Sequence, residues 1–236
     1  MYYIFFNIII FIFIFVLGYI SLTGIGKLTV NENYKFNNFF DLQIFGSINL
    51  LIVAYFINLT FGTNYIINII IFLIGLYLYF FYKKKLNKIK LSKIITLLII
   101  IFTVILISKT HEDFETYHFF SIYEVFNNNI RFGVSNLNER FFHSSLLVFN
   151  QSMYVFPYFE FKLVHFPVIY IYISTIGFFF NNLDKEKTKG SLIFSIFCLI
   201  ILIVKFNRLS EFGYDYISQF LILIIFYKFF FSKIKF

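Results

Sequence analysis

The feature that most constrains this chain is a series of long apolar stretches with very few charges. A helix needs about 20 residues to cross the ~30 Å hydrocarbon core of a bilayer. In that core every backbone N–H and C=O must be hydrogen-bonded, so a spanning segment of this kind has to be helical. The pattern predicts an all-α fold, a polytopic transmembrane helix bundle with about seven spans. The expected spans are residues 2–22, 42–61, 65–82, 94–108, 164–180, 191–206 and 219–232.

Composition excludes an ordinary soluble domain. Of the 236 residues, 60% are hydrophobic and 14% are charged, and the mean hydropathy is +0.82. Soluble domains are about half apolar and about a quarter charged. The net charge of +8 comes mostly from lysines beside the spans, where they set topology and meet anionic lipid. We therefore expect a single integral membrane domain over residues 1–236, with membrane lipids and no nucleic acid as partners. The lone Cys198 lies in an apolar stretch, which argues against a disulfide framework.

The lysines also predict the orientation. Six lie in residues 83–93, three in 181–190, and three in the C-terminal ten residues. Because lysine is enriched in cytoplasmic loops, we expect all three segments to be cytoplasmic in a bacterial inner membrane. The N-terminus is then outside and the C-terminus inside. The first apolar stretch has no basic leader and is longer than a signal-peptide core, so it is predicted to be a retained span.

This topology places residues 109–163 in one large external loop. Residues 144–156 are apolar but reach only ~20 Å as a helix, and Pro157 is a natural stop. We expect them to form a short re-entrant helix. In the alternative topology they cross the membrane, which moves 181–190 outside. The preferred topology puts 207–218 on the same outer face as the loop.

The loop opens with the sequence HEDFETYH at residues 111–118, an unusual concentration of acids beside a span. Residues 112–126 are predicted to be an amphipathic interfacial helix, ended by the asparagines at 127–129. The alternative is a solvated helix whose acids have no chemical role. Glu115 and His118 have the spacing of a carboxylate metal site but lack a second copy. No cofactor or metal is therefore expected, and a divalent metal remains the alternative.

Arginines accompany the acids on the outer face. Arg131 and Arg140 flank a Gly- and Asn-rich region, and Arg208 precedes Glu211 and Asp215 after a span. Arginine suits two-pronged binding of phosphate or carboxylate. The alternative for each arginine is a local surface ion pair with a neighbouring acid, which contributes little.

This arrangement resembles the GT-C type glycosyltransferases. It is more closely similar to a family of uncharacterised bacterial multi-spanning proteins linked to surface polysaccharide. The family pattern reads Asp-x-Gly-x-Tyr-His, Asn-Leu-x-x-Arg-Phe, a serine pair, and a later Arg-x-Ser-x-x-Gly-x-Asp tract. Glu115 stands at the glycine position, and the chain is shorter than these proteins, so a truncated form is an alternative. The matching residues are Asp113, Tyr117, His118, Asn136, Leu137, Arg140, Phe141, Ser144, Ser145, Arg208, Ser210, Gly213 and Asp215.

The resemblance implies sugar transfer from a polyprenyl-phosphate donor at the outer face, in cell-surface polysaccharide or glycoconjugate synthesis. Asp113 or Glu115 would be the catalytic base. A non-enzymatic component of polysaccharide assembly or export that binds lipid-linked glycan is the alternative, as is a multi-pass protein without activity. The sequence does not indicate the sugar, the acceptor or the oligomeric state. The expected substrate-binding residues are Tyr117, His118, Asn136, Arg140, Ser144, Arg208, Glu211 and Asp215.

Overall fold

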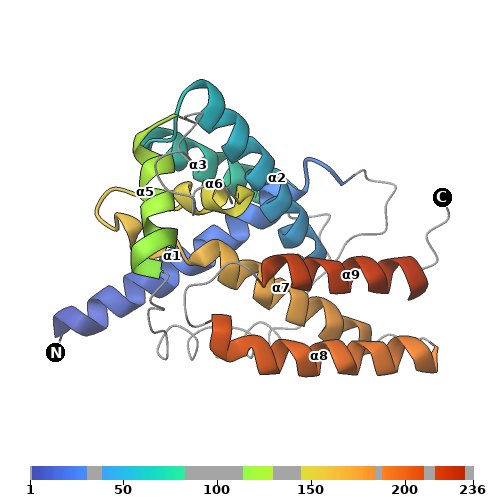
Figure 1. Cartoon of the computed structure of the whole chain (residues 1–236). Helices are drawn as coiled ribbons and strands as arrows, with labels where there is room; N and C mark the ends of the chain where they lie inside the picture. Colours follow the sequence, from blue (N-terminus) through green and yellow to red (C-terminus); the bar gives the residue numbers. More distant parts are fainter. Residues whose placement is uncertain are drawn as a thin grey trace. The chain divides into compact units, whose positions relative to one another are not determined.

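A computed structural model describes residues 2–30, 39–82, 114–129, 145–183, 188–209 and 216–231. The elements in these ranges are helices (Figure 1), apart from one isolated β-bridge between Phe156 and Glu160. The predicted span 94–108 lies outside the described residues. The helices are α1 (Tyr2–Gly26), α2 (Phe39–Thr60), α3 (Tyr65–Tyr82), η2 (Phe114–His118), α5 (Phe119–Asn127), α6 (Leu146–Ser152), η5 (Phe161–Leu163), α7 (Phe166–Leu183), α8 (Lys189–Leu209) and α9 (Ile217–Phe231).

Within the described ranges, four helical segments are long and apolar enough to cross a membrane: Ile8–Gly26, Phe39–Thr60, Phe161–Leu183 and Lys189–Phe206. The apolar segments of α3 and α9 are shorter than these four. These six segments correspond to six of the predicted spans and are consistent with a helical membrane bundle. The total of about seven spans stays a prediction.

Several helices expose large apolar side chains along one face, as helices in contact with lipid do. Soluble monomers rarely expose wide apolar patches, whereas lipid-facing positions are apolar by necessity. On α3 these exposed residues are Ile66, Ile69, Ile70, Leu73, Ile74, Tyr77, Phe80 and Phe81, and on α8 they are Leu192, Ile193, Ile196, Phe197, Ile200, Ile203 and Val204.

Contacts divide the chain into two compact units. Unit 1 comprises residues 1–87 and 121–167, and unit 2 comprises 88–120 and 168–236. Unit 1 holds α1, α2, α3, α6 and most of α5, and unit 2 holds α8, α9 and nearly all of α7. The prediction of a single domain stays a prediction.

In unit 1, α1 packs closely against both α2 and α3 through glycines. A Cβ atom on Gly24 would overlap the carbonyl oxygen of Gly75 in α3. On the other side of α1, a Cβ on Gly26 would overlap the carbonyl of Leu42, and a Cβ on Gly46 that of Leu22. Small residues permit such approach of helix backbones in membrane proteins, where packing rather than the hydrophobic effect drives helix association. The three glycine contacts therefore hold α1 between its two neighbours.

The two ends of this three-helix bundle differ. At one end the Phe39 ring, at the start of α2, stacks on Tyr19 of α1 with centroids 5.3 Å apart and meets Tyr79 of α3 at 6.4 Å. At the other end α2 and α3 join through a tight turn. Gly62 in that turn has φ +74°, a conformation that glycine adopts readily. Asn64 then caps α3, since its Oδ1 accepts a hydrogen bond from Ile67 N at 3.0 Å.

The predicted helix at 112–126 is confirmed over the residues that the structure describes, with one difference. Its first turn, η2, is a π-helix, and the α-helical part, α5, starts at Phe119. The expected stop is also confirmed, because α5 ends at Asn127. Residues 112 and 113 lie outside the described residues. The apolar side of α5 faces protein, with Ile122 and Phe126 buried.

The short apolar piece at 144–156 contains the seven-residue helix α6. Ser145 caps it by accepting a hydrogen bond from Leu147 N at 3.2 Å. Seven residues rise only about 10 Å, far less than the hydrocarbon core. Its C-terminal half is buried, and the Phe149 ring meets Tyr55 of α2 edge-on at 5.4 Å. The helix is thus too short to cross, and its re-entrant placement stays a prediction.

In unit 2, α7, α8 and α9 lie side by side (Figure 1). The buried Tyr172 hydroxyl on α7 donates to the Leu202 carbonyl of α8 at 3.0 Å. The Tyr227 ring of α9 meets Phe178 and Phe179 of α7 at 5.3 and 5.9 Å. Aromatic contacts of this kind add to area burial, so α7 contacts both of the other helices.

Candidate functional site

The segment between α3 and α7 is held to the α2–α3 turn by buried side chains of that hairpin. Asn58, near the end of α2, donates through Nδ2 to the carbonyl oxygens of Val125 at 2.7 Å and Asn128 at 3.2 Å. Thr63, in the turn itself, donates to the same Val125 carbonyl at 2.9 Å. Both side chains therefore bind the C-terminal end of α5.

A second asparagine makes the equivalent contact with α6. Asn68, in the first turn of α3, donates through Nδ2 to the carbonyls of Ser152 at 2.9 Å and Val155 at 2.8 Å. Ser152 is the last residue of α6, and Val155 lies three positions beyond it. Asn58, Thr63 and Asn68, with the carbonyls of Val125, Asn128, Ser152 and Val155, are called the loop dock below.

The chemistry of helix ends explains why these residues are asparagines. The last carbonyls of a helix have no partner within it, and Asn58 and Asn68 are 0% and 1% exposed. Water does not readily reach these buried positions, and a buried carbonyl without a hydrogen-bond partner destabilises the fold by about 1–3 kcal/mol. One carboxamide nitrogen has two hydrogens and can serve two carbonyls. Each asparagine thus supplies the partners that a buried helix end requires.

Aromatic rings line the same end of unit 1. Tyr65 of α3 meets Phe126 of α5 at 5.0 Å between ring centroids, and Phe126 meets Phe161 at 5.8 Å. Phe161 in turn meets Tyr123 at 5.7 Å. The row joins α3, α5 and η5, with Tyr65 and Tyr123 exposed at its ends. Tyrosines with one wet end are common at membrane–water interfaces.

A strained turn follows α6. Tyr158 and Glu160 have φ +74° and +47°, a region that residues other than glycine rarely adopt. The turn is closed by a 2.7 Å hydrogen bond from Glu160 N to the Phe156 carbonyl. Tyr158 is 78% exposed at its tip. Strained backbone of this kind is concentrated at functional sites.

The structure places the predicted site residues unevenly. Glu115, Tyr117 and His118 share the π-helical turn η2. The Tyr117 and His118 rings lie 5.0 Å apart, and His118 is buried. Arg208 lies in the last turn of α8. The other predicted residues lie outside the described residues; they are Asp113, Asn136, Arg140, Ser144, Glu211 and Asp215. Whether Asp113 lies near Arg140 therefore stays a prediction.

The described ranges give no metal centre: no group of three or more His, Cys, Asp or Glu side chains in them could hold an ion. A π-helical turn is often found at functional sites, and the acids precede or lie in η2.

Comparisons with protein-family models, with curated proteins and with solved structures found no match to this chain.

The loop dock was not predicted from the sequence. Its signal was present: Asn58 and Asn68 are polar residues inside stretches that are otherwise apolar, one on each side of the α2–α3 turn. Polar residues within a membrane segment usually face protein and hydrogen-bond to it. The carbonyls that these two asparagines bind lie 67 to 87 positions further along the chain, which no local pattern indicates.

Proposed function

We propose that this chain is an inner-membrane protein that transfers a sugar from a polyprenyl-phosphate donor at the outer face of a bacterial cell. The supporting observation is the loop dock. It binds the C-terminal ends of α5 and α6 with buried hydrogen bonds within unit 1, so the helix that follows the acids along the chain is anchored at its C-terminal end. General-base catalysis requires a base held within about 3 Å of the proton that it removes, and an anchored loop suits this requirement.

The proposed reaction uses residues from the family resemblance. Asp113 or Glu115 takes the proton from an acceptor hydroxyl, and the hydroxyl oxygen forms a bond to the anomeric carbon. The bond from that carbon to the donor phosphate oxygen breaks at the same centre, and the phosphate leaves on its lipid. Arg140 and Arg208 hold the charge that collects on the phosphate. Tyr117, His118, Asn136, Ser144, Glu211 and Asp215 complete the proposed substrate site.

The experiment compares surface glycan in cells that express the wild type or one of three variants. Asp113→Asn combined with Glu115→Gln keeps the shape of both side chains and removes both charges. Loss of a general base slows such a step roughly 10²–10⁴-fold, so glycan transfer should become undetectable at equal protein abundance. Arg140→Lys should also impair transfer, because an ammonium group cannot make the two-pronged phosphate contact.

Glu160→Gln provides the matched control, since it removes one carboxylate from the exposed turn of the same loop. It should leave glycan transfer unchanged. Normal glycan in the Asp113→Asn, Glu115→Gln double variant would show that neither acid is the base. If Arg140→Lys alone still failed, binding of lipid-linked glycan without catalysis would be the better description.

A further inference from the structure

The strained turn after α6 presents an exposed tyrosine. Residues 156–160, called the Tyr158 turn below, are closed at their base by the hydrogen bond from Glu160 N to the Phe156 carbonyl and by the β-bridge between the same two residues. Because the base is closed, the tip has a defined position. The Tyr158 ring meets that of Phe159 at 5.5 Å, yet Tyr158 is 78% exposed. A large aromatic ring is thus held out from the surface of unit 1.

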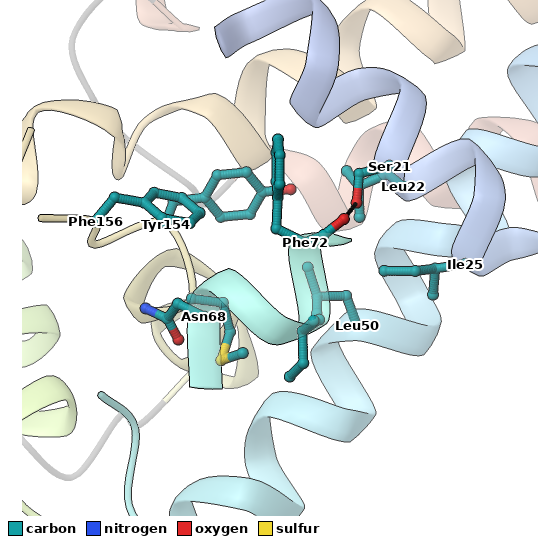
Figure 2. A pocket seen from close by; sticks show the side chains of 10 residues that line it. Ser21, Leu22, Ile25, Leu50, Asn68, Phe72, Tyr154 and Phe156 are labelled. Atoms are coloured by element: carbon teal, nitrogen blue, oxygen red, sulfur yellow. Dashed lines mark hydrogen bonds between the residues drawn. The ribbon is translucent and has the colours of Figure 1, made fainter. Parts of the chain in front are cut away.

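Contacts with α3 set the level of this turn along that helix. At its base the Phe156 ring meets Phe72 edge-on at 5.7 Å, and Asn68 binds the preceding carbonyl. Asn68, Phe72 and Phe156 line one small pocket, which Figure 2 shows from close by. A helix rises about 1.5 Å per residue, so Asn68 and Phe72 lie about 5 and 10 Å from the start of α3 at Tyr65. The Tyr158 turn therefore lies beside the first two turns of α3, within unit 1.

The exposed face of α3 indicates what surrounds the molecule at this level. Its middle exposes aliphatic side chains such as Ile70 and Leu73, whereas Tyr65 is exposed at its start and Tyr77 and Phe81 near its end. No charged residue occurs between positions 61 and 82. Spanning helices show this order, with aliphatic residues among the acyl chains and aromatic residues at both interfaces. Tyr65 and Phe81 are about 24 Å apart along the axis, so the order favours lipid around this face and headgroups near Tyr65.

The side chains of the turn suit the headgroup layer and not the acyl chains. A tyrosine has an apolar ring and a hydroxyl that can stay hydrogen-bonded to water or to a headgroup, so it is favoured at this boundary. Glu160 and Lys162 follow within four positions and are exposed. Charged side chains are unfavourable among acyl chains, so these two limit how deeply the turn can enter. Lipid is the occupant that fits, because the turn lies where the exposed face of α3 changes from aliphatic to aromatic.

We propose that the Tyr158 turn is a membrane-interface anchor, with the Tyr158 ring inserted among the lipid headgroups at the Tyr65 end of α3. The anchor adds a lipid contact to the segment that Asn68 of the loop dock already holds to α3. The inference rests on the membrane placement of α3. It does not depend on sugar transfer, because it uses only contacts within unit 1.

Tryptophan fluorescence tests the anchor, because the chain contains no tryptophan and a single introduced one is the only source of that emission. Tyr158→Trp is compared with Leu73→Trp, an exposed position in the middle of α3, in the full chain reconstituted into phosphatidylcholine vesicles. Bromine on the acyl chains quenches tryptophan on contact, and it is placed either near the glycerol or near the chain end. The shallow bromines should quench Tyr158→Trp severalfold more than the deep ones, and Leu73→Trp should show the reverse.

Three outcomes would overturn the proposal. Quenching of Tyr158→Trp by neither lipid would show that the ring meets water or another protein, and stronger quenching by the deep bromines would place it among the acyl chains. If neither lipid quenched Leu73→Trp, α3 would not face lipid and the anchor would fail with it.

Spin labels give a second measurement that needs no tryptophan in the turn. Single cysteines replace Tyr158 or Lys162 in a Cys198→Ala background, and each label is tested for collision with dissolved oxygen and with a water-soluble nickel complex. Oxygen is concentrated in lipid, so the oxygen-to-nickel ratio should be severalfold higher at position 158 than at the charged position 162. An equal or lower ratio at 158 would contradict insertion of the tip.

Discussion

Asn58 and Asn68 lie on opposite sides of the α2–α3 turn, and each donates two hydrogen bonds to carbonyls at the end of a different loop helix. One hairpin thus anchors two elements of the segment between α3 and α7. Because α5 and α6 are only nine and seven residues long, neither is expected to be stable alone. The loop dock is therefore the feature through which the bundle gives the loop a defined structure.

Replacing Asn68 with leucine should destabilise the protein by about 2–4 kcal/mol, because the change leaves two buried carbonyls without donors. Asn58→Leu should cost about 1–3 kcal/mol, because Thr63 still donates to the Val125 carbonyl. Unfolding of the purified protein in mixed micelles measures this loss. Asn127→Ala is the control, since that side chain is exposed and bonds only within its own helix. It should stay within ~0.5 kcal/mol of the wild type. A similar small effect for all three would show that the loop is not held by these side chains.

Gly24→Ala should disrupt the crossing of α1 and α3, because the added Cβ would overlap the Gly75 carbonyl. Overpacking of this kind typically costs about 1–3 kcal/mol, and backbone atoms give way less easily than side chains. Gly190→Ala is the matched control, where the new Cβ would lie 3.4 Å from a Phe231 ring atom. Thermal unfolding compares the two. Equal midpoints for both variants would argue against the close α1–α3 packing.

Gly62→Ala should destabilise the α2–α3 turn. Gly62 has φ +74°, where an L-residue costs about 1–2 kcal/mol, and its Cβ would meet the Asn129 side chain. The loss should appear as faster proteolysis of the segment that holds α5 and α6, measured by limited digestion of the purified protein in mixed micelles. A digestion rate equal to that of the wild type would show that the turn conformation does not matter for docking.

Accessibility labelling tests the proposed topology. In a Cys198→Ala background, single cysteines replace Phe61, Tyr158 and Lys189, all of which are exposed. An impermeant maleimide added outside should modify positions 61 and 158 but not 189. Modification at 61 and 189 without 158 would indicate that the 144–156 segment crosses the membrane. No modification at 61 would indicate that the whole orientation is inverted.

The secondary structure could be predicted from the sequence to a greater extent than the packing of the helices. The helices at 2–26, 39–60 and 166–183 follow from apolar runs, because a backbone in lipid has to satisfy its own hydrogen bonds. The stop of α5 at Asn127 follows from the poor helix propensity of consecutive asparagines. These are local effects, and local effects can be seen in local sequence.

The tertiary structure decided what those helices do to one another. The role of Gly24 and Gly75 depends on the crossing of α1 and α3, which brings the two backbones together at these glycines. Asn58 and Asn68 appear in the sequence as isolated polar residues, and the fold places the ends of α5 and α6 beside them. Hydrogen bonds between residues far apart in the sequence depend on loop closure and packing, which no short pattern encodes. The sequence by itself therefore determined that this chain forms apolar helices, and only the packing decided that α5 and α6 are anchored to the α2–α3 hairpin.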